Sequence, residues 1–357
     1  MLKSLSGKFT CKTTPLLNIF KRSRSTQCQP ISSSDRSSSV SIVNIDWTKQ
    51  NQGVPNMSKK LIYHSYRHPN RPISKGPVQG VILDWSGTTA DAYVDSVKDG
   101  MIQTFGAFGI EINNLQARKP MGHHKKLHIA AIGADENVQE QWKNKYGRLL
   151  TLEGPNNDLD KLFTYYENLQ MKLLEKPNNK YTRLLPGTAW TVDILRKDFK
   201  LKIGSTTGFT RRLSAPILKH AAEQGYAPDI NIAADEPPRS RPYFDGVLMN
   251  ALQLGDISDL TNLVKVDDTR SGIQEGRKAG LITVFLAGKG NRMGELSENP
   301  EELLSQNPNL YNKYLEETRR YGAESGANFV ADDITALPEI IDKINSLLAN
   351  GKLNPYD

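Results

Sequence analysis

The chain has 357 residues, 38% of them hydrophobic, which is enough for a packed core with an insertion or a second domain. No run approaches the roughly 18 to 20 apolar residues of a membrane-spanning helix. The net charge of +7 is uneven, because residues 1–77 hold 13 Lys and Arg but 2 Asp and Glu (+11), which leaves −4 for residues 78–357. The basicity therefore lies outside the expected folded part, and a nucleic-acid-binding function loses its main support.

Residues 1–75 are predicted to form a disordered basic extension. No acidic residue precedes Asp35, whereas Lys, Arg, Ser and Thr are frequent. This composition resembles an organelle transit peptide and predicts a mitochondrial location, the alternative being a basic tail without an address on a cytoplasmic protein. The Ser, Asn and Gln of residues 31–60 predict a linker. Both cysteines, Cys11 and Cys28, lie in the extension, so the folded part cannot form an internal disulfide.

The remaining sequence predicts strands that alternate with helices. After a strand at 81–83, apolar residues spaced by three and four indicate helices from Tyr93 to about Leu169, with no strand before about residue 199. Next come strands near 200–205, 230–233, 263–266 and 282–287, and helices near 189–197, 210–225, 244–254 and 271–280. Short strands alternating with helices predict an α/β fold whose parallel sheet has helices on both faces.

The segment at 80–89, Gly-Val-Ile-Leu-Asp-Trp-Ser-Gly-Thr-Thr, carries most of the chemical signal. Asp84 ends an apolar strand, and open α/β sheets bind ligands at that end of a strand. The N–H groups of the following turn can bind an anion. A carboxylate would repel that anion unless a divalent cation lay between them, so the segment predicts nucleophilic phosphoryl chemistry with Mg²⁺. The alternative is a buried strand that ends at an N-capping aspartate.

This segment resembles the first motif of the haloacid dehalogenase superfamily, whose phosphotransferases form an aspartyl-phosphate. Most phosphatases of that superfamily have a general-acid Asp two residues later, where this chain has Ser86, and the Asp-Trp-Ser-Gly-Thr-Thr string resembles the phosphonatase (phosphonoacetaldehyde hydrolase) branch. The resemblance implies a Rossmann-like parallel sheet core (78–91 and 186–350) with an inserted helical cap (92–185). It also implies substrate contacts in the first turn, at Ser86, Gly87 and Thr88.

Two further motifs follow in the superfamily's order. Lys-Ile-Gly-Ser-Thr-Thr-Gly at 202–208 resembles the second motif, which implies that Thr206 or Thr207, with Gly208, binds a phosphoryl oxygen. The residues alone do not decide between the two threonines, and a lone Ser/Thr turn is usually a helix N-cap. Arg241 stands where the family has its cation, and a guanidinium binds phosphonyl oxygens in a bidentate manner. The neighbouring Arg239 is interpreted as a solvated surface residue.

The predicted strand at 263–266 ends in Asp267-Asp268-Thr269. Paired carboxylates are suitable ligands for Mg²⁺. The family has Gly-Asp-Thr here, so Asp268 matches the ligand, and the resemblance implies that Mg²⁺ is held at three positions: Asp84, Ser86 and Asp268. Asp267 stands where the family has Gly, and Gly272 stands where it has a further Asp near the metal. This departure predicts weaker Mg²⁺ binding unless Asp267 or water fills the missing place.

The cap contains Arg-Lys-Pro-Met at 118–121, then Lys125 and His128, in the register of the phosphonatase pattern. The resemblance implies that Lys125 forms a Schiff base with the substrate aldehyde, that His128 assists proton transfer and that Met121 contacts the substrate. A protonated imine accepts the electrons of a breaking C–P bond, which explains how the reaction proceeds without an acid at Ser86. Two alternatives stay open: a solvated Lys/His-rich helix face, and a metal site formed by His123, His124 and His128.

The resemblance covers about residues 78–345 and predicts hydrolysis of phosphonoacetaldehyde to acetaldehyde and phosphate, with Mg²⁺ as cofactor. It implies a small phosphonate substrate and a homodimer formed through the cap, and the sequence predicts no nucleic-acid or membrane partner. Two other functions remain open. One is a Mg²⁺-dependent phosphatase or phosphomutase acting on a phosphate ester, and the other is a non-enzymatic relative that keeps the fold.

Overall fold

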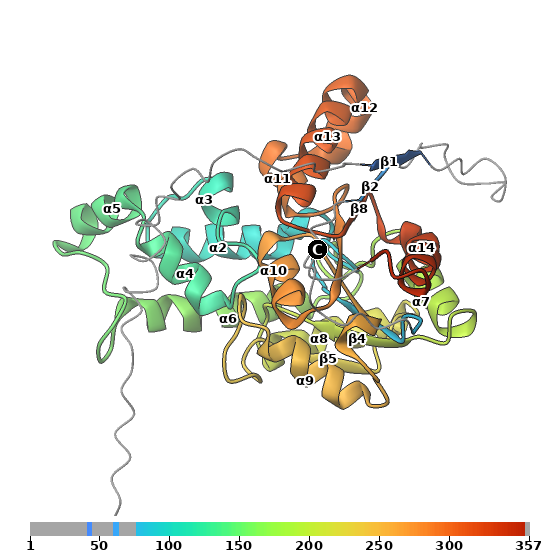
Figure 1. Ribbon diagram of the computed structural model, residues 1–357. Helices are drawn as coiled ribbons and strands as arrows, with labels where there is room; N and C mark the ends of the chain where they lie inside the picture. The colour runs from blue at the N-terminus through green and yellow to red at the C-terminus, as the bar shows by residue number, and fades with distance from the viewer. Residues whose placement is uncertain (1–40, 45–59, 64–75, 354–357) are drawn as a thin grey trace, which may run out of the picture. The chain divides into compact units, whose positions relative to one another are not determined.

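The computed structural model describes residues 41–44, 60–63 and 76–353 (Figure 1). One sheet has the strand order β1-β2-β8-β7-β6-β3-β4-β5. Its strands from β8 to β5 are parallel, namely β3 (Gly80–Leu83), β4 (Lys202–Thr206), β5 (Ile230–Ile232), β6 (Leu263–Asp267), β7 (Ile282–Leu286) and β8 (Phe329–Ala331). The predicted α/β fold with a parallel sheet is confirmed. Strand β8 and the helix after it, α14 (Leu337–Ala349), were not predicted as elements.

Two short strands come from the predicted extension. β1 (Ser41–Asn44) and β2 (Lys60–Tyr63) pair with each other, and β2 pairs with β8, in both cases antiparallel. The sequence predicts a linker here because the apolar runs are too short to stand out among Ser, Asn and Gln. The rest of the extension, including the predicted transit peptide and both cysteines, lies outside the described residues.

Helices cover both faces of the sheet (Figure 1), and the alternation of side chains along β3 shows why. Val81 and Leu83 belong to the hydrophobic cluster that includes α7 (Thr188–Lys197), α8 (Arg211–Glu223) and α14. Ile82 points the other way and packs with α9 (Asp245–Leu254). A strand buried on both faces reads as a continuous apolar run, as this one does.

The segment between β3 and α7 is helical, which confirms the predicted helical insert. Its helices are η3 (Ala92–Val94), α2 (Asp95–Ala107), α3 (Asn114–Arg118), α4 (Lys125–Gly133), α5 (Glu136–Tyr146) and α6 (Asp158–Leu174). Helix α5 ends at Gly147, which takes a left-handed conformation with φ 71°. Helix α6 begins after Asn157, whose side chain accepts a hydrogen bond from the Asp160 N–H. The sequence indicates the same interruption through Gly154-Pro155-Asn156-Asn157.

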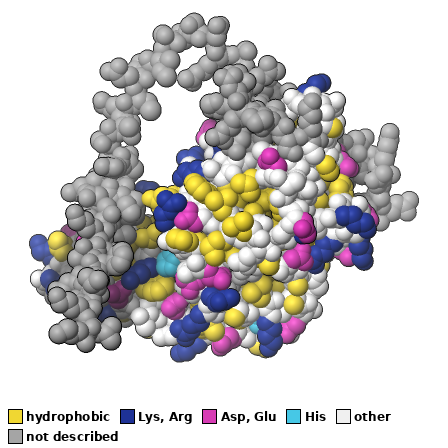
Figure 2. Space-filling view, turned by 60° about the horizontal axis from the view of Figure 1, so that its bottom comes forward, with side chains coloured by type: hydrophobic (Ala, Val, Ile, Leu, Met, Phe, Trp, Pro, Cys, Tyr) yellow, Lys and Arg dark blue, Asp and Glu magenta, His cyan; other side chains and the backbone are white. Residues whose placement is uncertain are grey.

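The remaining elements follow β6. Helix α10 (Arg270–Ala279) leads to β7, and three helices precede β8: α11 (Asn291–Leu296), α12 (Pro300–Gln306) and α13 (Pro308–Glu324). None of the described helices is long and apolar enough to cross a membrane. On the face shown in Figure 2, Lys and Arg side chains alternate with Asp and Glu around apolar ones, so that face has no continuous basic surface.

Replacing Phe105 with alanine is expected to lower the free energy of unfolding by about 3 to 5 kcal/mol, because Phe105 of α2 is fully buried in the cap. Leu252 is the matched control, since it is 81% exposed and its replacement with alanine is expected to change stability by less than about 0.5 kcal/mol. Urea denaturation measures both values. Equal losses would show that Phe105 does not belong to the core.

Candidate active site

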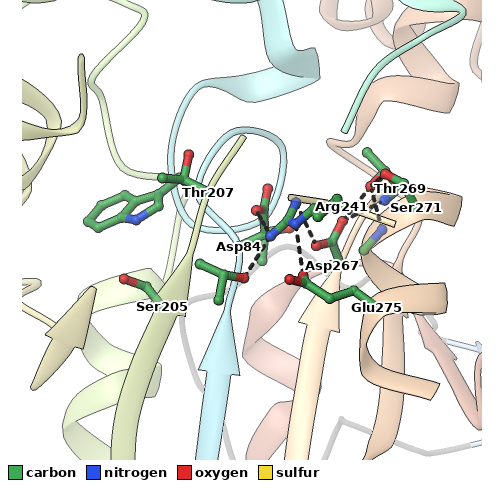
Figure 3. Close-up of polar contacts among 12 residues, drawn as sticks. Asp84, Ser205, Thr207, Arg241, Asp267, Thr269, Ser271 and Glu275 are labelled. Atoms are coloured by element: carbon green, nitrogen blue, oxygen red, sulfur yellow. Dashed lines mark hydrogen bonds and ion pairs between the residues drawn. The ribbon is translucent and has the colours of Figure 1, made fainter. Parts of the chain in front are cut away.

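The carboxyl ends of three neighbouring strands bring the predicted site residues together. Strand β3 lies between β4 and β6, so Asp84 after β3 lies beside Thr206, at the end of β4, and beside Asp267, at the end of β6. Arg241 enters from the loop before α9. Figure 3 shows its guanidinium reaching between Asp84, Asp267 and Glu275. Parallel strands thus gather residues from segments far apart in the sequence, as predicted for this edge.

Arg241 is the centre of a buried network. Its Nη2 donates to Asp84 Oδ1 and to Thr206 Oγ1, both at 2.7 Å, and its Nε donates to Glu275 Oε2 at 2.8 Å. Its Nη1 lies 3.4 Å from Asp267 Oδ2. Burial alone lowers the pKa of Arg241, but the carboxylates outweigh burial and raise it overall, so this residue stays charged. Arg239 lies outside the network and pairs with Asp245.

Three buried aspartates, Asp84, Asp267 and Asp268, each offer an oxygen within 4.8 Å of the others. Burial and the neighbouring Asp267 raise the pKa of Asp84, and the same two causes raise the pKa of Asp268 well above its usual value. Burial also raises the pKa of Asp267, but Lys265 and Arg241 outweigh it, so the net direction is downward. Asp267 is therefore the aspartate that is most firmly ionised.

The buried cluster has more carboxylates than cationic side chains. When ionised, Asp84, Asp267, Asp268 and Glu275 supply four negative charges, whereas Arg241 and Lys265 supply two positive ones. A divalent ion would balance this buried charge, and carboxylate oxygens are the ligands that Mg²⁺ and similar hard cations prefer. The donor set thus fits a divalent-cation site of the haloacid dehalogenase type.

The turn after Asp84 is tight. Gly87 has φ +80°, and a Cβ there would overlap Asp268 Oδ2, so only glycine fits. The N–H groups of Gly87, Thr88 and Thr89 donate to carbonyl groups of the same turn. These three groups close the turn, and the anion-binding role that the sequence predicts for the turn stays a prediction. The Thr88 hydroxyl lies 3.4 Å from Asp268 Oδ1, and half-buried Ser86 forms a β-bridge with Ala90.

The two threonines at the end of β4 face different partners. Thr206 Oγ1 accepts from Arg241 and, at 3.0 Å, from Lys265 Nζ. Thr207 Oγ1 accepts from the Phe209 N–H at 3.1 Å. The structure thus brings the hydroxyl of Thr206, and not that of Thr207, into the Arg241 network. With two cationic donors on its oxygen, the Thr206 hydroxyl is left to donate its own hydrogen to another group.

Lys125 brings the cap to this site. It is 4% exposed, and its Nζ lies 5.0 Å from the centre of the Phe209 ring. Gly208 allows the close approach, because a Cβ there would lie 3.0 Å from the His123 carbonyl oxygen and 3.3 Å from Lys125 Nζ. A small cavity at the same place is lined by both parts of the chain, among them His124, Thr206, Thr207, Gly208, Arg241 and Glu275.

Burial lowers the pKa of Lys125 to about 8, against an opposing effect of the Asp84 charge. An ordinary lysine is almost fully protonated at neutral pH, whereas this amine is unprotonated in part of the molecules. The Asp84 charge opposes the effect of burial and raises the pKa of Lys125, as expected for an amine of the cap that lies near the carboxylate of the sheet. A solvated helix face, which was the alternative for Lys125, does not describe this side chain.

His128 lies one helical turn after Lys125 and is fully buried. Its Nε2 is 2.8 Å from the Ala117 carbonyl oxygen, and since a carbonyl group only accepts, Nε2 carries the hydrogen. Its Nδ1 has no hydrogen-bond partner among the described residues. Burial, and next the Lys125 charge, lower the pKa of His128 well below its usual value, so the ring is neutral and Nδ1 is a free base. Met121 is buried in the preceding loop.

Three buried charged residues near the site were not singled out from the sequence. Lys265 contacts Thr206 and Asp267, and Glu275 contacts Arg241. Asp91 follows the first turn and accepts hydrogen bonds from Ser96, and burial raises its pKa to about 7. A charged residue inside an apolar strand, as at Lys265, or on the buried side of a helix, as at Glu275, indicates a buried partner and was the available signal.

This geometry, with the cap inserted between β3 and β4, defines the class of protein: a member of the haloacid dehalogenase superfamily. A solved structure of β-phosphoglucomutase from Clostridium difficile supports the fold, with a TM-score of 0.51 and 15% identity over 75% of this chain and 97% of that chain. A solved phosphonoacetaldehyde hydrolase-like protein from Oleispira antarctica has a TM-score of 0.72 and 29% identity, and covers 80% of this chain and 99% of that one.

Two curated relatives place the chain within the superfamily. It is 33% identical over 284 residues to the phosphonoacetaldehyde hydrolase of Syntrophobacter fumaroxidans, a match that spans 80% of this chain and 98% of that protein. It is 34% identical over 277 residues to the same enzyme of Hahella chejuensis, across 78% of this chain and 90% of that protein. No family model matches the chain. The chain belongs to the phosphonoacetaldehyde hydrolase family.

Proposed function

We propose that this chain hydrolyses the C–P bond of phosphonoacetaldehyde and releases acetaldehyde and phosphate. The observation that carries the proposal is the buried Lys125 amine, with a pKa of about 8, in the same site as Asp84 and Arg241. An unprotonated amine attacks an aldehyde, and a carboxylate attacks phosphorus. A substrate with an aldehyde at one end and a phosphonyl group at the other would react with both the amine and the carboxylate.

The first step joins the substrate to the cap. Lys125 Nζ attacks the aldehyde carbon, water leaves, and a protonated imine forms. This exchange of protons needs a base, and the neutral His128 offers its unpartnered Nδ1. The positive imine then withdraws electrons from the neighbouring C–P bond.

The second step takes place at the sheet. An oxygen of Asp84 attacks phosphorus, and the electrons of the C–P bond pass to the imine to give an enamine, so no acid is needed at Ser86. Arg241 shifts from the carboxylate to the phosphonyl oxygens, where its N–H groups offset the growing charge. The free hydrogen of the Thr206 hydroxyl donates to the same group. A divalent cation, which Asp84 and Asp268 would hold, would supply Lewis-acid stabilisation of the phosphonyl oxygens.

The last steps consume water. Water attacks the phosphorus of the aspartyl-phosphate and releases phosphate, which restores Asp84. The enamine takes up a proton, and a second water hydrolyses the imine to acetaldehyde and the free Lys125 amine. One water was released when the imine formed, so the cycle consumes one water for each phosphonoacetaldehyde.

A specific observation keeps a second candidate, a phosphatase or phosphomutase acting on a phosphate ester. That reaction needs an acid to protonate the leaving oxygen. Asp91 is 2% exposed, has a pKa raised to about 7 by burial, and interacts with Ser86. It is thus a buried acid beside the position where most phosphatases of the superfamily have theirs.

The two candidates are separated by their products. We would measure acetaldehyde release from phosphonoacetaldehyde and phosphate release from a panel of sugar phosphates, each with and without Mg²⁺. The proposal expects Mg²⁺-dependent acetaldehyde release and little hydrolysis of the esters. Phosphate release from an ester without any acetaldehyde from the phosphonate would refute it in favour of the second candidate.

Imine formation is expected to accelerate as the pH rises through about 8, because the pKa of Lys125 lies there and only the unprotonated amine attacks. Acetaldehyde serves as the probe, with borohydride to trap the imine, and mass spectrometry at pH 6 to 10 measures the rate of labelling. A lysine with an ordinary pKa would keep gaining rate up to about pH 10.4. A profile of that kind would rule out the buried Lys125 as the reactive amine.

A further inference from the structure

We propose that Arg118 holds the cap against the sheet and is the positioning residue that keeps Lys125 close to Asp84. Its effect on catalysis rests on the proposed function, whereas its effect on the cap does not. Arg118 lies at the end of α3 in the cap and is fully buried. None of the reaction steps above uses it. It contacts the entry segment, residues 91–95, through which the chain passes from the sheet into the cap.

The backbone of the entry segment is strained. Asp91, Tyr93 and Val94 have positive φ angles of 52°, 61° and 60°, a region that residues other than glycine rarely adopt. Such a backbone persists only where its surroundings hold it in place. Arg118 Nη1 donates to the Tyr93 carbonyl oxygen, and its Nη2 donates to Asp95 Oδ1 at 2.8 Å. The guanidinium therefore binds the strained segment on both sides of Val94.

The same guanidinium reaches the α/β core. Its Nη1 lies 3.4 Å from Asn291 Oδ1, at the start of α11, and the Asn291 N–H donates to Asp268 Oδ2 at 2.7 Å. Asn114 of the cap supports this contact, because it accepts from Arg118 Nε at 2.7 Å and donates to the Gly294 carbonyl oxygen at 3.0 Å. One side chain thus joins the cap, the entry segment and the helix that begins beside Asp268.

Gly294 leaves the space that the guanidinium occupies. A Cβ built on Gly294 would lie 2.7 Å from Arg118 Cζ, closer than real Cβ atoms come to other atoms. Glycine is unfavourable inside a helix, and Gly294 lies inside α11. A glycine at such a position indicates a packing or functional reason. The close approach of Arg118 from the cap is that reason here.

The competing role for Arg118 is that of a buried ion pair. Arg118 pairs with Asp95, and a buried ion pair matters for the stability of a fold wherever it lies. In that role, a change at Arg118 lowers the melting temperature but leaves the folded protein unchanged. If Arg118 holds the cap, the same change alters the folded protein, namely the surroundings of Lys125 and the entry segment. The two roles therefore predict different results below the melting temperature.

Two measurements on the full-length protein report the position of the cap, and neither needs a phosphonate. Trapping of the acetaldehyde imine with borohydride at a series of pH values reports how deeply Lys125 is buried. Hydrogen exchange, read by mass spectrometry, reports how firmly the entry segment is held, since the Tyr93 N–H donates to the Lys289 carbonyl oxygen of the core at 2.6 Å. Turnover of phosphonoacetaldehyde is measured in parallel.

Arg118→Lys keeps the charge but loses the planar set of N–H groups that reaches the entry segment and α11 together. The cap is then expected to open more often. The midpoint of imine labelling should move from about pH 8 toward the value of about 10.4 of an ordinary lysine, because the amine gains access to water. Exchange of the Tyr93 N–H should accelerate by about tenfold or more. The value of kcat/KM should fall by a factor on the order of 10².

Gly294→Ala tests the same contact without changing Arg118, since the added methyl group displaces the guanidinium and alanine otherwise favours a helix. It is expected to shift all three measurements in the same direction. Gly106→Ala is its matched control, because Gly106 lies in the cap helix α2 and a Cβ there meets nothing within 4 Å. Arg319→Lys is the control for Arg118→Lys, because Arg319 is buried and pairs with Asp332 outside the cap. Both controls are expected to match the wild type in all three measurements.

Wild-type labelling and exchange in both Arg118→Lys and Gly294→Ala would overturn the proposal and assign Arg118 the role of a buried ion pair. Equal shifts in Arg319→Lys would overturn it as well. If Arg118→Lys does not fold, Gly294→Ala decides between the two roles. Failure of the proposed function is separate. A protein whose exchange accelerates in Arg118→Lys, but which releases no acetaldehyde from phosphonoacetaldehyde, would refute the function and leave the role of Arg118 in holding the cap intact.

Discussion

Replacing Lys125 with arginine is expected to abolish acetaldehyde release, with a loss on the order of 10⁴-fold or more. A guanidinium has a pKa above 12 and stays protonated, so it forms no imine. It keeps the positive charge and much of the length of lysine, which separates the loss of the nucleophile from a loss of charge. Without the imine, the electrons of the C–P bond have no acceptor, so attack by Asp84 on phosphorus does not break that bond.

The neighbouring residue supplies the control for this change. Lys126 lies on the same helix but is half-buried and pairs with Asp160 rather than with the site, so Lys126→Arg should keep wild-type turnover. Borohydride reduction in the presence of phosphonoacetaldehyde should label Lys125 in the wild type and leave Lys125→Arg unlabelled, as read by peptide mass spectrometry. Turnover in Lys125→Arg, or a label on another lysine, would refute the role of Lys125.

Replacing Asp84 with asparagine is expected to stop phosphate release to a similar degree, on the order of 10⁴-fold, because an amide does not attack phosphorus. The imine step should survive, so borohydride should still label Lys125 in this variant. Asp84→Asn therefore separates the chemistry of the sheet from that of the cap. Parallel loss of labelling would mean that Asp84 is needed before the C–P bond breaks.

Asp84→Asn is expected to lower activity but not the stability of the fold. The folded protein raises the pKa of Asp84, so its ionised form is disfavoured by folding, and stability is gained as the pH falls through the raised pKa. A neutral amide removes that penalty, and the melting temperature at pH 7 should stay level or rise. Asp193→Asn, at an exposed position, is the control for both activity and stability. A marked drop in melting temperature would show that the ion pair with Arg241 outweighs the burial.

The fold and the strand-end residues could be predicted because they follow from periodicity. Buried strands read as apolar runs, and parallel strands place their carboxyl ends together, which brings Asp84, the Thr206-Thr207 pair and the Asp267-Asp268 pair to one edge. Periodicity does not choose within either pair: the family's pattern indicated Asp268, and the structure shows Thr206 in contact with Arg241. Arg241 and Lys125 lie on a loop and on the cap, and no spacing rule connects them to that edge. They were found from the family resemblance alone.

The sequence does not show which buried charged residues pair with each other. Lys265 stands inside an apolar strand and Glu275 on the buried side of a helix, and each makes sense only beside its partner. Likewise, a Cβ at Gly272 would overlap the Asp267 carboxylate, and a sequence does not show that two residues compete for the same space. The hydrogen bonds that close the turn at Gly87 depend on backbone geometry for the same reason.

The absence of a side chain at Gly208 determines how closely the cap packs against the sheet. A Cβ at this position would lie 3.0 Å from the His123 carbonyl oxygen and 3.3 Å from Lys125 Nζ, so a larger residue would push that part of the cap away. Under the proposed function, the Lys125 amine and the Asp84 carboxylate act on the two ends of one substrate. A bulkier residue at position 208 is then expected to shift the preference from phosphonoacetaldehyde to aldehydes with a longer chain.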